Sequence, residues 1–290
     1  MPPQPGILAP CAAAAHFLAV RLTAPDQGLP FYEALRALSI DDRIVVGLGQ
    51  PLVSGAEIPV PGLRAFPVLV RPDSNVPSTQ VDAWFYLRGD DPGQTMLAAR
   101  DLIAKFPSGI EISEDVAAFK YGAGRDLSGY EDGTENPQEG AAEAAAFVPD
   151  GEFSGSSFVA AQRWVHDLSV LQRLDPSERD AIVGRNRDTN EELPDAPASA
   201  HVKRTAQESF DPAAFMLRRS MPYGGTKEHG LYFVAFGADL DRFERMMRRM
   251  VGEDDGVTDA LFRFSRPVSG GYYWCPAVVD GKLALPAIVP

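Results

Sequence analysis

Residues 129–137 read Gly-Tyr-Glu-Asp-Gly-Thr-Glu-Asn-Pro, and the interpretation of the whole chain starts from this stretch. Its glycines permit backbone conformations that are closed to other residues, and they let a ligand come close to the main chain. The proline at its end keeps Asn136 out of a helix and favours a turn. We therefore expect a tight, rigid loop that presents Asp132 rather than burying it. Taken alone, the acidic residues are more typical of a surface loop than of a functional site.

The composition of the chain excludes several classes of protein. A net charge of −13 over 290 residues argues against nucleic acid and against anionic membrane surfaces as partners. Cys11 and Cys275 form no CxxC pattern, which argues against a disulfide framework, a thiolate metal site and covalently attached haem. The N-terminus shows no signal-peptide pattern, and the apolar run at 11–20 is too short to span a bilayer. We expect a cytoplasmic protein.

Apolar periodicity predicts strands and helices in a similar order in the two halves of the chain. It predicts a helix at 92–106 with an apolar stripe of Leu97, Leu102 and Ile103. This order favours an α+β fold in which helices cover one face of antiparallel sheets. We place the boundary between residues 145 and 146, so that residues 129–137 lie where the halves meet. The expected strands are 16–22, 42–47, 80–87, 110–121, 157–165, 214–220, 230–237 and 271–275, and the other expected helices are 29–38, 177–183 and 239–251.

Four histidines are available as metal ligands or proton carriers. We expect His16 in the core, and His166 and His229 at the surface. His201 differs because it begins a basic cluster, His-Val-Lys-Arg, in an acidic chain. No paired-histidine spacing occurs, which argues against a zinc site with several histidine ligands. One histidine is enough to ligate haem iron, so that chemistry stays open.

Further polar residues follow in the C-terminal half. If residues 216–220 form a strand, Arg218 and Ser220 share one of its faces. Together with Asp132 they would suit a small polar pocket, although Arg218 could equally pair with a surface acid. Asp259 precedes an apolar run and, taken alone, is typical of a helix cap. The acids of 131–135 leave a second alternative open, a calcium or magnesium site.

Taken in order, these segments resemble the dye-decolorizing peroxidases, in particular the compact bacterial members of class B. The resemblance covers nearly the whole chain. A lone GxxDG motif such as 129–133 is weakly specific, but its combination with the histidine and arginine segments in this order is strong. The other matching segments are 4–8 (QPGIL), 200–205 (AHVKRT), 218–224 (RRSMPYG), 230–233 (GLYF) and 267–273 (PVSGGYY).

The resemblance implies two ferredoxin-like halves with haem b held non-covalently, mainly by the C-terminal half. It implies His201 as the iron ligand, with Asp132 and Arg218 on the opposite, peroxide-binding side. The other positions assigned to the site are Ser220 beside Arg218, Asp259 as acceptor of the second N–H of His201, Arg185 near a haem propionate, and Glu135 and Asn136 in the loop.

The implied function is a peroxidase that reduces hydrogen peroxide through a ferryl intermediate and oxidises dyes, phenolic compounds or other bulky one-electron donors. A haem- or porphyrin-processing enzyme and a haem carrier are the alternatives on the same fold. A bulky donor cannot enter a pocket sized for peroxide, so tryptophans such as Trp84, Trp164 and Trp274, with Tyr272 and Tyr273, are candidate electron relays as well as candidate core residues. We expect a homo-oligomer, as in relatives. Residues 283–290 show no recognisable signal for packaging in a nanocompartment.

Overall fold

A computed structural model describes residues 1–287 of the chain. Its α-helices are α1 (Pro5–Leu8), α2 (Gly28–Ala37), α3 (Gln50–Gly55), α4 (Pro92–Ile103), α5 (Glu139–Ala146), α6 (Leu168–Arg173), α7 (Pro176–Val183), α8 (His201–Arg204) and α9 (Asp241–Met250). Short 3-10 helices lie at η1 (Pro25–Gln27), η2 (Gln207–Ser209) and η3 (Ala260–Arg263). The expectation for 283–290 falls partly outside the described residues.

Its strands are β1 (Ala14–Leu22), β2 (Ile44–Gly49), β3 (Leu69–Arg71), β4 (Ser74–Val76), β5 (Ala83–Gly89), β6 (Ile110–Phe119), β7 (Ser157–His166), β8 (Leu217–Arg218), β9 (Met221–Gly224), β10 (His229–Gly237), β11 (Ser265–Pro267), β12 (Gly271–Cys275), β13 (Val278–Val279) and β14 (Lys282–Leu283).

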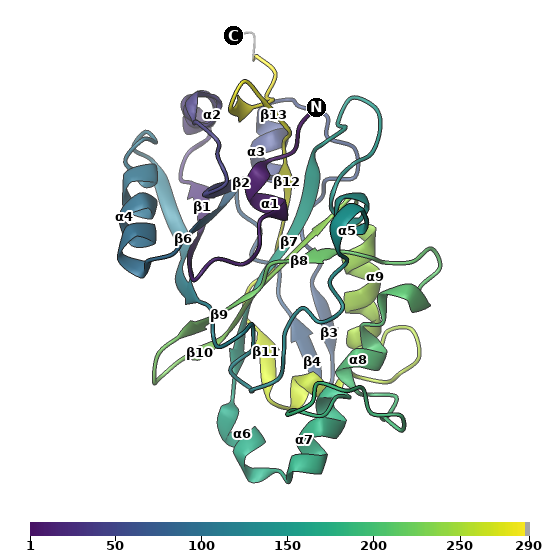
Figure 1. Cartoon of the computed structure of the whole chain (residues 1–290). Helices are drawn as coiled ribbons and strands as arrows, with labels where there is room; N and C mark the ends of the chain where they lie inside the picture. The colour runs from purple at the N-terminus through teal and green to yellow at the C-terminus, as the bar shows by residue number, and fades with distance from the viewer. Residues whose placement is uncertain (288–290) are drawn as a thin grey trace.

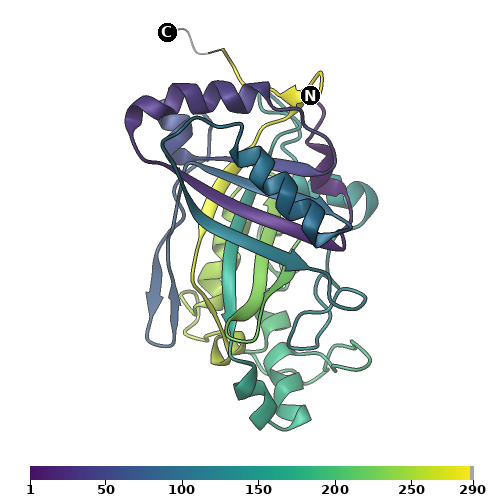
Figure 2. The same cartoon turned by 90° about the vertical axis from the view of Figure 1, so that its left-hand side faces the viewer.

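Strands from both halves of the chain close into one antiparallel ring. Its order is β7, β12, β2, β5, β1, β6, β9 and β10, and β10 pairs back onto β7. β11 pairs with the C-terminal end of β7, and β8 pairs with β10. Figure 2 shows the strands of the N-terminal half in front of those of the C-terminal half. The expected α+β class, with helices covering antiparallel strands, is confirmed.

The strands bury a different apolar set on each face. One face carries stacked aromatic side chains, among them Phe17 and Tyr232 with ring centroids 4.1 Å apart. The other face is covered by helices: α2 and α4 pack over the N-terminal strands, and α9 packs over the C-terminal ones. Trp84 and Tyr86 lie together on the first face, as period-two spacing requires. The N-terminus lies at the end of the molecule opposite to α6 and α7 (Figure 1).

Two predictions about individual elements are wrong. The strand expected at 214–220 is only the two-residue β8, because the backbone N–H groups of Ala214 and Met216 donate to Gln207 instead of to a neighbouring strand. The stripe expected on α4 is also misplaced, since Leu97 is 48% exposed. Residues five apart point about 140° away from each other on a helix, so Leu97 cannot share a face with Leu102. Thr95, Ala99 and Leu102 face the sheet instead.

The Ala-rich segment at the expected boundary is an ordered helix. α5 buries Ala142, Ala145 and Ala146 against the core, and β7 begins eleven residues after it ends. The division between residues 145 and 146 stays a prediction, because strands from both sides of it share the ring. The chain also continues beyond β12, expected as its last strand, into the β13–β14 hairpin. Within residues 1–287, no helix is long and apolar enough to cross a bilayer.

Candidate active site

A cavity, called the main cavity below, lies between β7, β10, the inner face of α9 and the loop that precedes α5. Most of its wall is apolar, and its polar side chains gather on two sides. The apolar wall includes Trp164, Phe233, Phe243, Met246, Met247, Met250, Leu261 and Phe264, and the polar side chains include Asp126, Asp132, Gln162, His166, His201 and Arg218. The helix expected at 239–251 corresponds to α9, which buries Phe243 and three methionines on its inner face.

His201 and Asp259 form the polar pair on one side of the cavity. A backbone hydrogen bond of 2.7 Å from Ala260 to Ser199 holds η3 beside the start of α8. Asp259 Oδ2 thereby lies 2.8 Å from His201 Nδ1, while its Oδ1 accepts the backbone N–H of Leu261 at 2.8 Å. Asp259 is therefore both the helix cap and the partner of the histidine. Because its Nδ1 is engaged, His201 has only Nε2 left for a ligand.

Asp132 and Arg218 lie on the other side. Arg218 is held through its backbone: Asn136 Oδ1 accepts its N–H at 2.8 Å, and Asn136 Nδ2 donates to its carbonyl at 3.1 Å. The Nε atom of Arg218 is buried without a hydrogen-bond partner among the described residues. Burial raises the pKa of Asp132 above its usual value, although the Arg218 charge acts to lower it. The half-buried Arg218 cation and a carboxyl group whose pKa lies above its usual value thus line the same space.

The glycines of the loop have the backbone angles that the sequence predicts. Gly129 and Gly133 have φ of +94° and +81°, a region that L side chains rarely adopt. Tyr130, between them in the motif, donates a hydrogen bond of 2.6 Å to Asp180 of α7. Asp132 is half-buried rather than fully presented to solvent. The loop is anchored on both sides of its aspartate.

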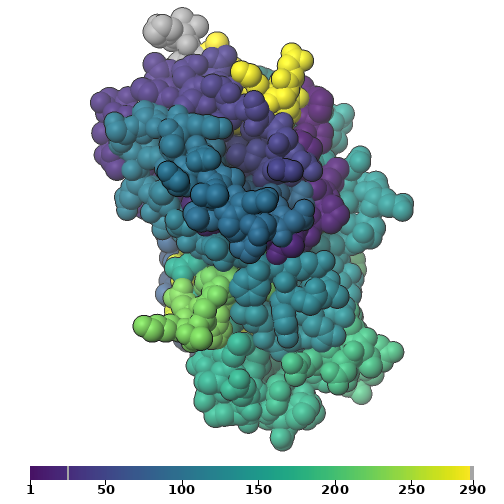
Figure 3. All heavy atoms as spheres, turned by 60° about the vertical axis from the view of Figure 1, so that its left-hand side comes forward, coloured from purple at the N-terminus to yellow at the C-terminus, as the bar shows by residue number. Residues whose placement is uncertain are grey.

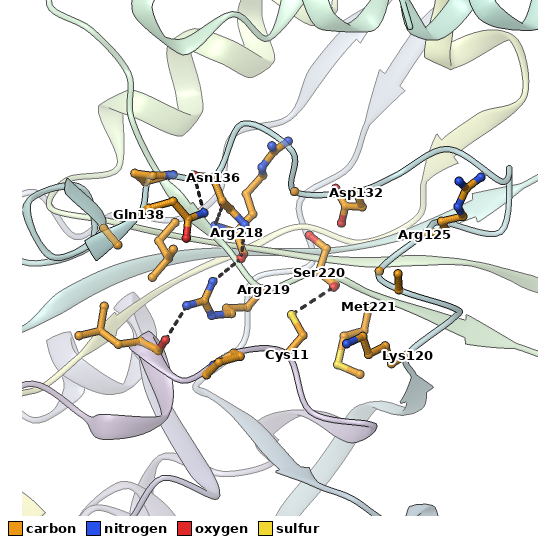
Figure 4. Close-up of a pocket in the computed structure, with 18 of the residues that line it drawn as sticks. Cys11, Lys120, Arg125, Asp132, Asn136, Gln138, Arg218, Arg219, Ser220 and Met221 are labelled. Carbon is orange, nitrogen blue, oxygen red and sulfur yellow. Dashed lines mark hydrogen bonds between the residues drawn. The ribbon is translucent and has the colours of Figure 1, made fainter. Parts of the chain in front are cut away.

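Asp132 and Arg218 also line a second, more open pocket, called the outer pocket (Figure 4). Cys11, Lys120 and Ser220 lie around it, and Ser220 does not line the main cavity. Its Oγ accepts the backbone N–H of Val234 at 3.2 Å. The carboxylate and the guanidinium are thus the shared wall between the main cavity and a route to solvent.

Besides Ser220 and Asp259, three further expected site residues do not line the main cavity. Asn136 positions Arg218, as described above. The carboxylate of Glu135 is 63% exposed and pairs with Arg185, which also donates to the carbonyl of Asn190 at 2.8 Å. The carboxylate of Glu131 accepts a hydrogen bond of 2.9 Å from Asn190 Nδ2. Among residues 1–287 no three metal-binding side chains converge, so the calcium or magnesium alternative gains no support.

The sequence did not predict one buried side chain of the cavity wall. His166, expected at the surface, is 7% exposed. Its Nε2 lies 3.0 Å from Asp126 Oδ1 and its Nδ1 lies 2.7 Å from Ser265 Oγ. Although burial opposes it, hydrogen bonding to His166 and Ser128 keeps the pKa of Asp126 below its usual value. The signal was present in the alternation of Gln162, Trp164 and His166 along β7, but the predicted strand ended one residue early.

These residues fit a flat, largely apolar group that carries a metal. The aromatic and methionine walls suit the faces of a porphyrin, and haem iron requires a single nitrogen, which His201 Nε2 offers. On the opposite side, the buried and unpaired Nε of Arg218 calls for an oxygen-bearing or anionic ligand. The donor set therefore fits haem with one protein ligand.

Comparisons with known proteins agree with this chemistry. A family model described as Dyp-type peroxidase, C-terminal, matches residues 123–280. The dye-decolorizing peroxidase of Mycolicibacterium paratuberculosis is 32% identical over 98% of this chain and 87% of its own length. That of Mycobacterium tuberculosis is 31% identical over 95% of this chain and 88% of its own length.

Solved structures give the same picture. A dye-decolorizing protein from V. cholerae is 30% identical, with a TM-score of 0.84 over 94% of this chain and 96% of that chain. DyPB from Rhodococcus jostii RHA1 is 28% identical, with a TM-score of 0.87 over 95% of this chain and 96% of that chain. A variant of the Rhodococcus protein has been solved in complex with heme.

Proposed function

Because this chain belongs to the family of dye-decolorizing, or Dyp-type, peroxidases, we propose that its main cavity binds haem b through His201 and reduces hydrogen peroxide at the expense of bulky one-electron donors. The expected family and enzyme class, a peroxidase, are confirmed by the match, which does not favour the haem-processing or carrier alternatives. Haem as the cofactor is supported by the haem complex of the Rhodococcus relative. The observation that carries the proposal is His201, held by Asp259 with one nitrogen free, in a cavity that Arg218 also lines with an Nε unpaired among residues 1–287.

His201 and Asp259 would set the electronic character of the site. Asp259 would accept a hydrogen bond from the Nδ1–H group, which keeps the lone pair on Nε2 and makes the imidazole a stronger electron donor to the iron. Haem, when bound, would supply the iron that reduces peroxide and that then takes electrons, one at a time, from the donors. The oxidised intermediate expected from the resemblance stays a prediction.

Asp132 and Arg218 would handle the proton and the charge of peroxide. Cleavage of the oxygen–oxygen bond requires a proton to move from one oxygen to the other, and an ionised Asp132 is placed to carry it. Arg218, which stays protonated, would stabilise the negative charge that develops as the bond breaks. Water can also carry the proton, so we propose that Arg218 is essential and Asp132 contributory. Ser220 would act from the outer pocket.

The first experiment tests haem binding. Purified holoprotein should show a Soret absorption band, and His201→Ala should abolish it because the iron loses its only protein ligand. His229→Ala is the matched control, since His229 does not line the main cavity. A Soret band of unchanged position and intensity in His201→Ala would contradict the assignment of the ligand.

The second experiment tests the ranking of the two side chains. Stopped-flow mixing of each haem-loaded variant with hydrogen peroxide should show a larger loss of rate for Arg218→Ala than for Asp132→Ala. A group that stabilises developing charge contributes about 100-fold or more, whereas a shuttle that water replaces contributes less. The reverse order would reject the ranking.

The electron donors and the oligomeric state also belong to this proposal. We propose dyes and phenolic compounds as donors, and a homo-oligomer as the state in solution, which one light-scattering run would check. The cytoplasmic location and the contact of Arg185 with a propionate stay predictions.

A further inference from the structure

A groove on the outside of the molecule adjoins the main cavity. It lies between the tip of the β9–β10 hairpin, the start of α6 and the segment from η3 to β11. Figure 3 shows the green hairpin tip projecting above the teal lobe that contains α6 and α7. The groove and the main cavity share His166, Phe264 and Ser265 as lining residues. Only this layer of buried side chains separates the two spaces.

The groove is basic although the chain is acidic. Lys227, Arg263 and Arg266 are exposed and line it, and Asp167 is the one carboxylate among its lining residues. Within residues 1–287 none of the three cations has a carboxylate oxygen within 4.0 Å. Glu228, the neighbour of Lys227 in sequence, pairs with Arg163 instead. The three positive charges are therefore free to attract an anion.

Aromatic contacts connect the groove to the main cavity. Phe262, which lines the groove, packs on Trp164 of the cavity wall with ring centroids 5.5 Å apart. Phe264 packs on His166 with centroids 5.6 Å apart. Trp164 is 5% exposed and its indole N–H donates to Gln162 Oε1 at 3.3 Å. A donor in the groove would lie one aromatic side chain away from an oxidisable indole.

We propose that this groove binds anionic aromatic one-electron donors, held by Lys227, Arg263 and Arg266, and that their electrons enter the main cavity through Trp164. The inference rests on the proposed function, because haem and peroxide supply the oxidant. Hydrogen peroxide takes up two electrons and two protons to give two waters. Two phenolic donor molecules each lose one electron and one proton, so the reaction balances.

The charge of the groove distinguishes this donor class from others. A neutral phenol gains nothing from the three cations, whereas a sulfonate or carboxylate on an aromatic ring pairs with them while the ring contacts Phe262. A cationic donor would be repelled there.

The test uses two donors that share one ring system and differ by one anionic sulfonate group, 2-naphthol and 2-naphthol-6-sulfonate. The groove variant carries Lys227→Gln, Arg263→Gln and Arg266→Gln together. The control variant carries Arg71→Gln, Lys105→Gln and Lys282→Gln, three exposed cations outside the groove. Both variants lower the net charge from −13 to −16 (−13 − 3). The comparison therefore separates a local site from a change in overall charge.

Two readouts apply. Equilibrium dialysis without peroxide measures the Kd of each naphthol, and steady-state turnover with peroxide measures KM and kcat. We expect the groove variant to raise Kd and KM for the sulfonate by about tenfold, from three exposed charge contacts, and to leave the values for 2-naphthol unchanged. The control variant should keep the wild-type values for both donors. Salt should weaken the binding of the sulfonate to the wild type and to the control variant, but not to the groove variant.

The outcomes separate the two proposals. Equal effects of the two triple variants on the sulfonate, or no effect of either, would overturn the groove as the donor site. Absence of a Soret band, or of peroxide turnover with any donor, would overturn the proposed function instead, while the dialysis measurement would still decide whether the groove binds the sulfonate.

Discussion

Asp132 is the residue whose ionisation should control the reaction with peroxide. Burial raises its pKa above the usual value of about 3.9, and a proton carrier must be ionised when peroxide arrives. We expect the rate of the peroxide reaction to rise with pH through a midpoint above that value. Arg218→Gln should move the midpoint upward because the Arg218 charge lowers the pKa of Asp132. Stopped-flow rates from pH 4 to 8 would measure both midpoints.

The control for this effect is Asp132→Asn, which should remove the midpoint of the rate.

The raised pKa of Asp132 also predicts how the stability of the protein changes with pH. A carboxyl whose pKa is raised in the folded state favours folding below its unfolded pKa, and this contribution is lost as pH rises through the folded pKa. Asp132→Asn should therefore gain stability relative to wild type at pH 7 compared with pH 4 in urea unfolding. An unchanged pH–rate midpoint in Asp132→Asn would assign the titration to another group.

The family resemblance of segments 129–133, 200–205 and 218–224 predicted Asp132, His201 and Arg218 as site residues, and all three line one cavity. It could not predict His166 beside Asp126, because the pair joins residues 40 positions apart. It also could not show that Asn136 acts through the backbone of Arg218, which depends on a contact across 82 positions. The sequence of a strand does not show which distant residue will cover one of its polar side chains.

The loop 126–137 is the element on which the site geometry depends. Gly129→Ala would place a Cβ where φ is +94° and only 2.4 Å from Arg187 Nε. The left-handed backbone alone costs about 1–2 kcal/mol for a residue with a Cβ. We expect a loss of about that size in the free energy of unfolding, together with a slower peroxide reaction because the loop carries Asp132. Urea unfolding and stopped-flow mixing would measure the two effects.

Gly62→Ala is the matched control for the backbone term. Gly62 has φ of +82°, and a Cβ there would meet nothing within 4 Å. It should lose similar stability and keep the wild-type rate with peroxide. If both variants lost stability and neither lost rate, the loop would not position Asp132.

Elements that form from local patterns were predicted well, and those that depend on distant partners were not. The helix expected at 177–183 corresponds to α7, where Glu178 accepts the backbone N–H of Asp175 at 3.0 Å. The strand expected at 214–220 failed because the backbone before β8 donates its N–H groups to Gln207 instead of to a neighbouring strand. Local propensity decides the first case, and tertiary contact decides the second.

At the scale of the whole molecule, the closure of the strands was beyond sequence reasoning. The expected pattern of two halves is compatible with two separate sheets, whereas β12 pairs with β2 and β9 pairs with β6 across the expected boundary. The register between such distant strands is set by which faces become buried. The alternating pattern of one strand does not indicate which other strand it pairs with. The class of the fold was therefore predictable and its closure was not.

Overall charge makes a further prediction that does not depend on a single residue. At pH 7 the net charge of −13 repels anionic donors over the molecule as a whole, and it falls toward zero near the sequence pI of about 4.8. We expect the ratio of kcat/KM for 2-naphthol-6-sulfonate to that for 2-naphthol to rise as pH falls from about 7 to about 5, where carboxylates and histidines take up protons. High salt should flatten this rise.

The ratio isolates donor association, because any effect of Asp132 on the peroxide step acts equally on both naphthols. Two histidines line the groove, and His166 is buried, so His229→Gln distinguishes overall charge from the more exposed of the two. It should keep most of the rise, since the change in net charge comes from carboxylates and histidines over the whole chain. A ratio that stays constant between pH 5 and 7 at low salt would show that long-range repulsion does not limit the donor. The three cations of the groove would then be sufficient to recruit it, because local attraction would already outweigh the charge of the rest of the molecule.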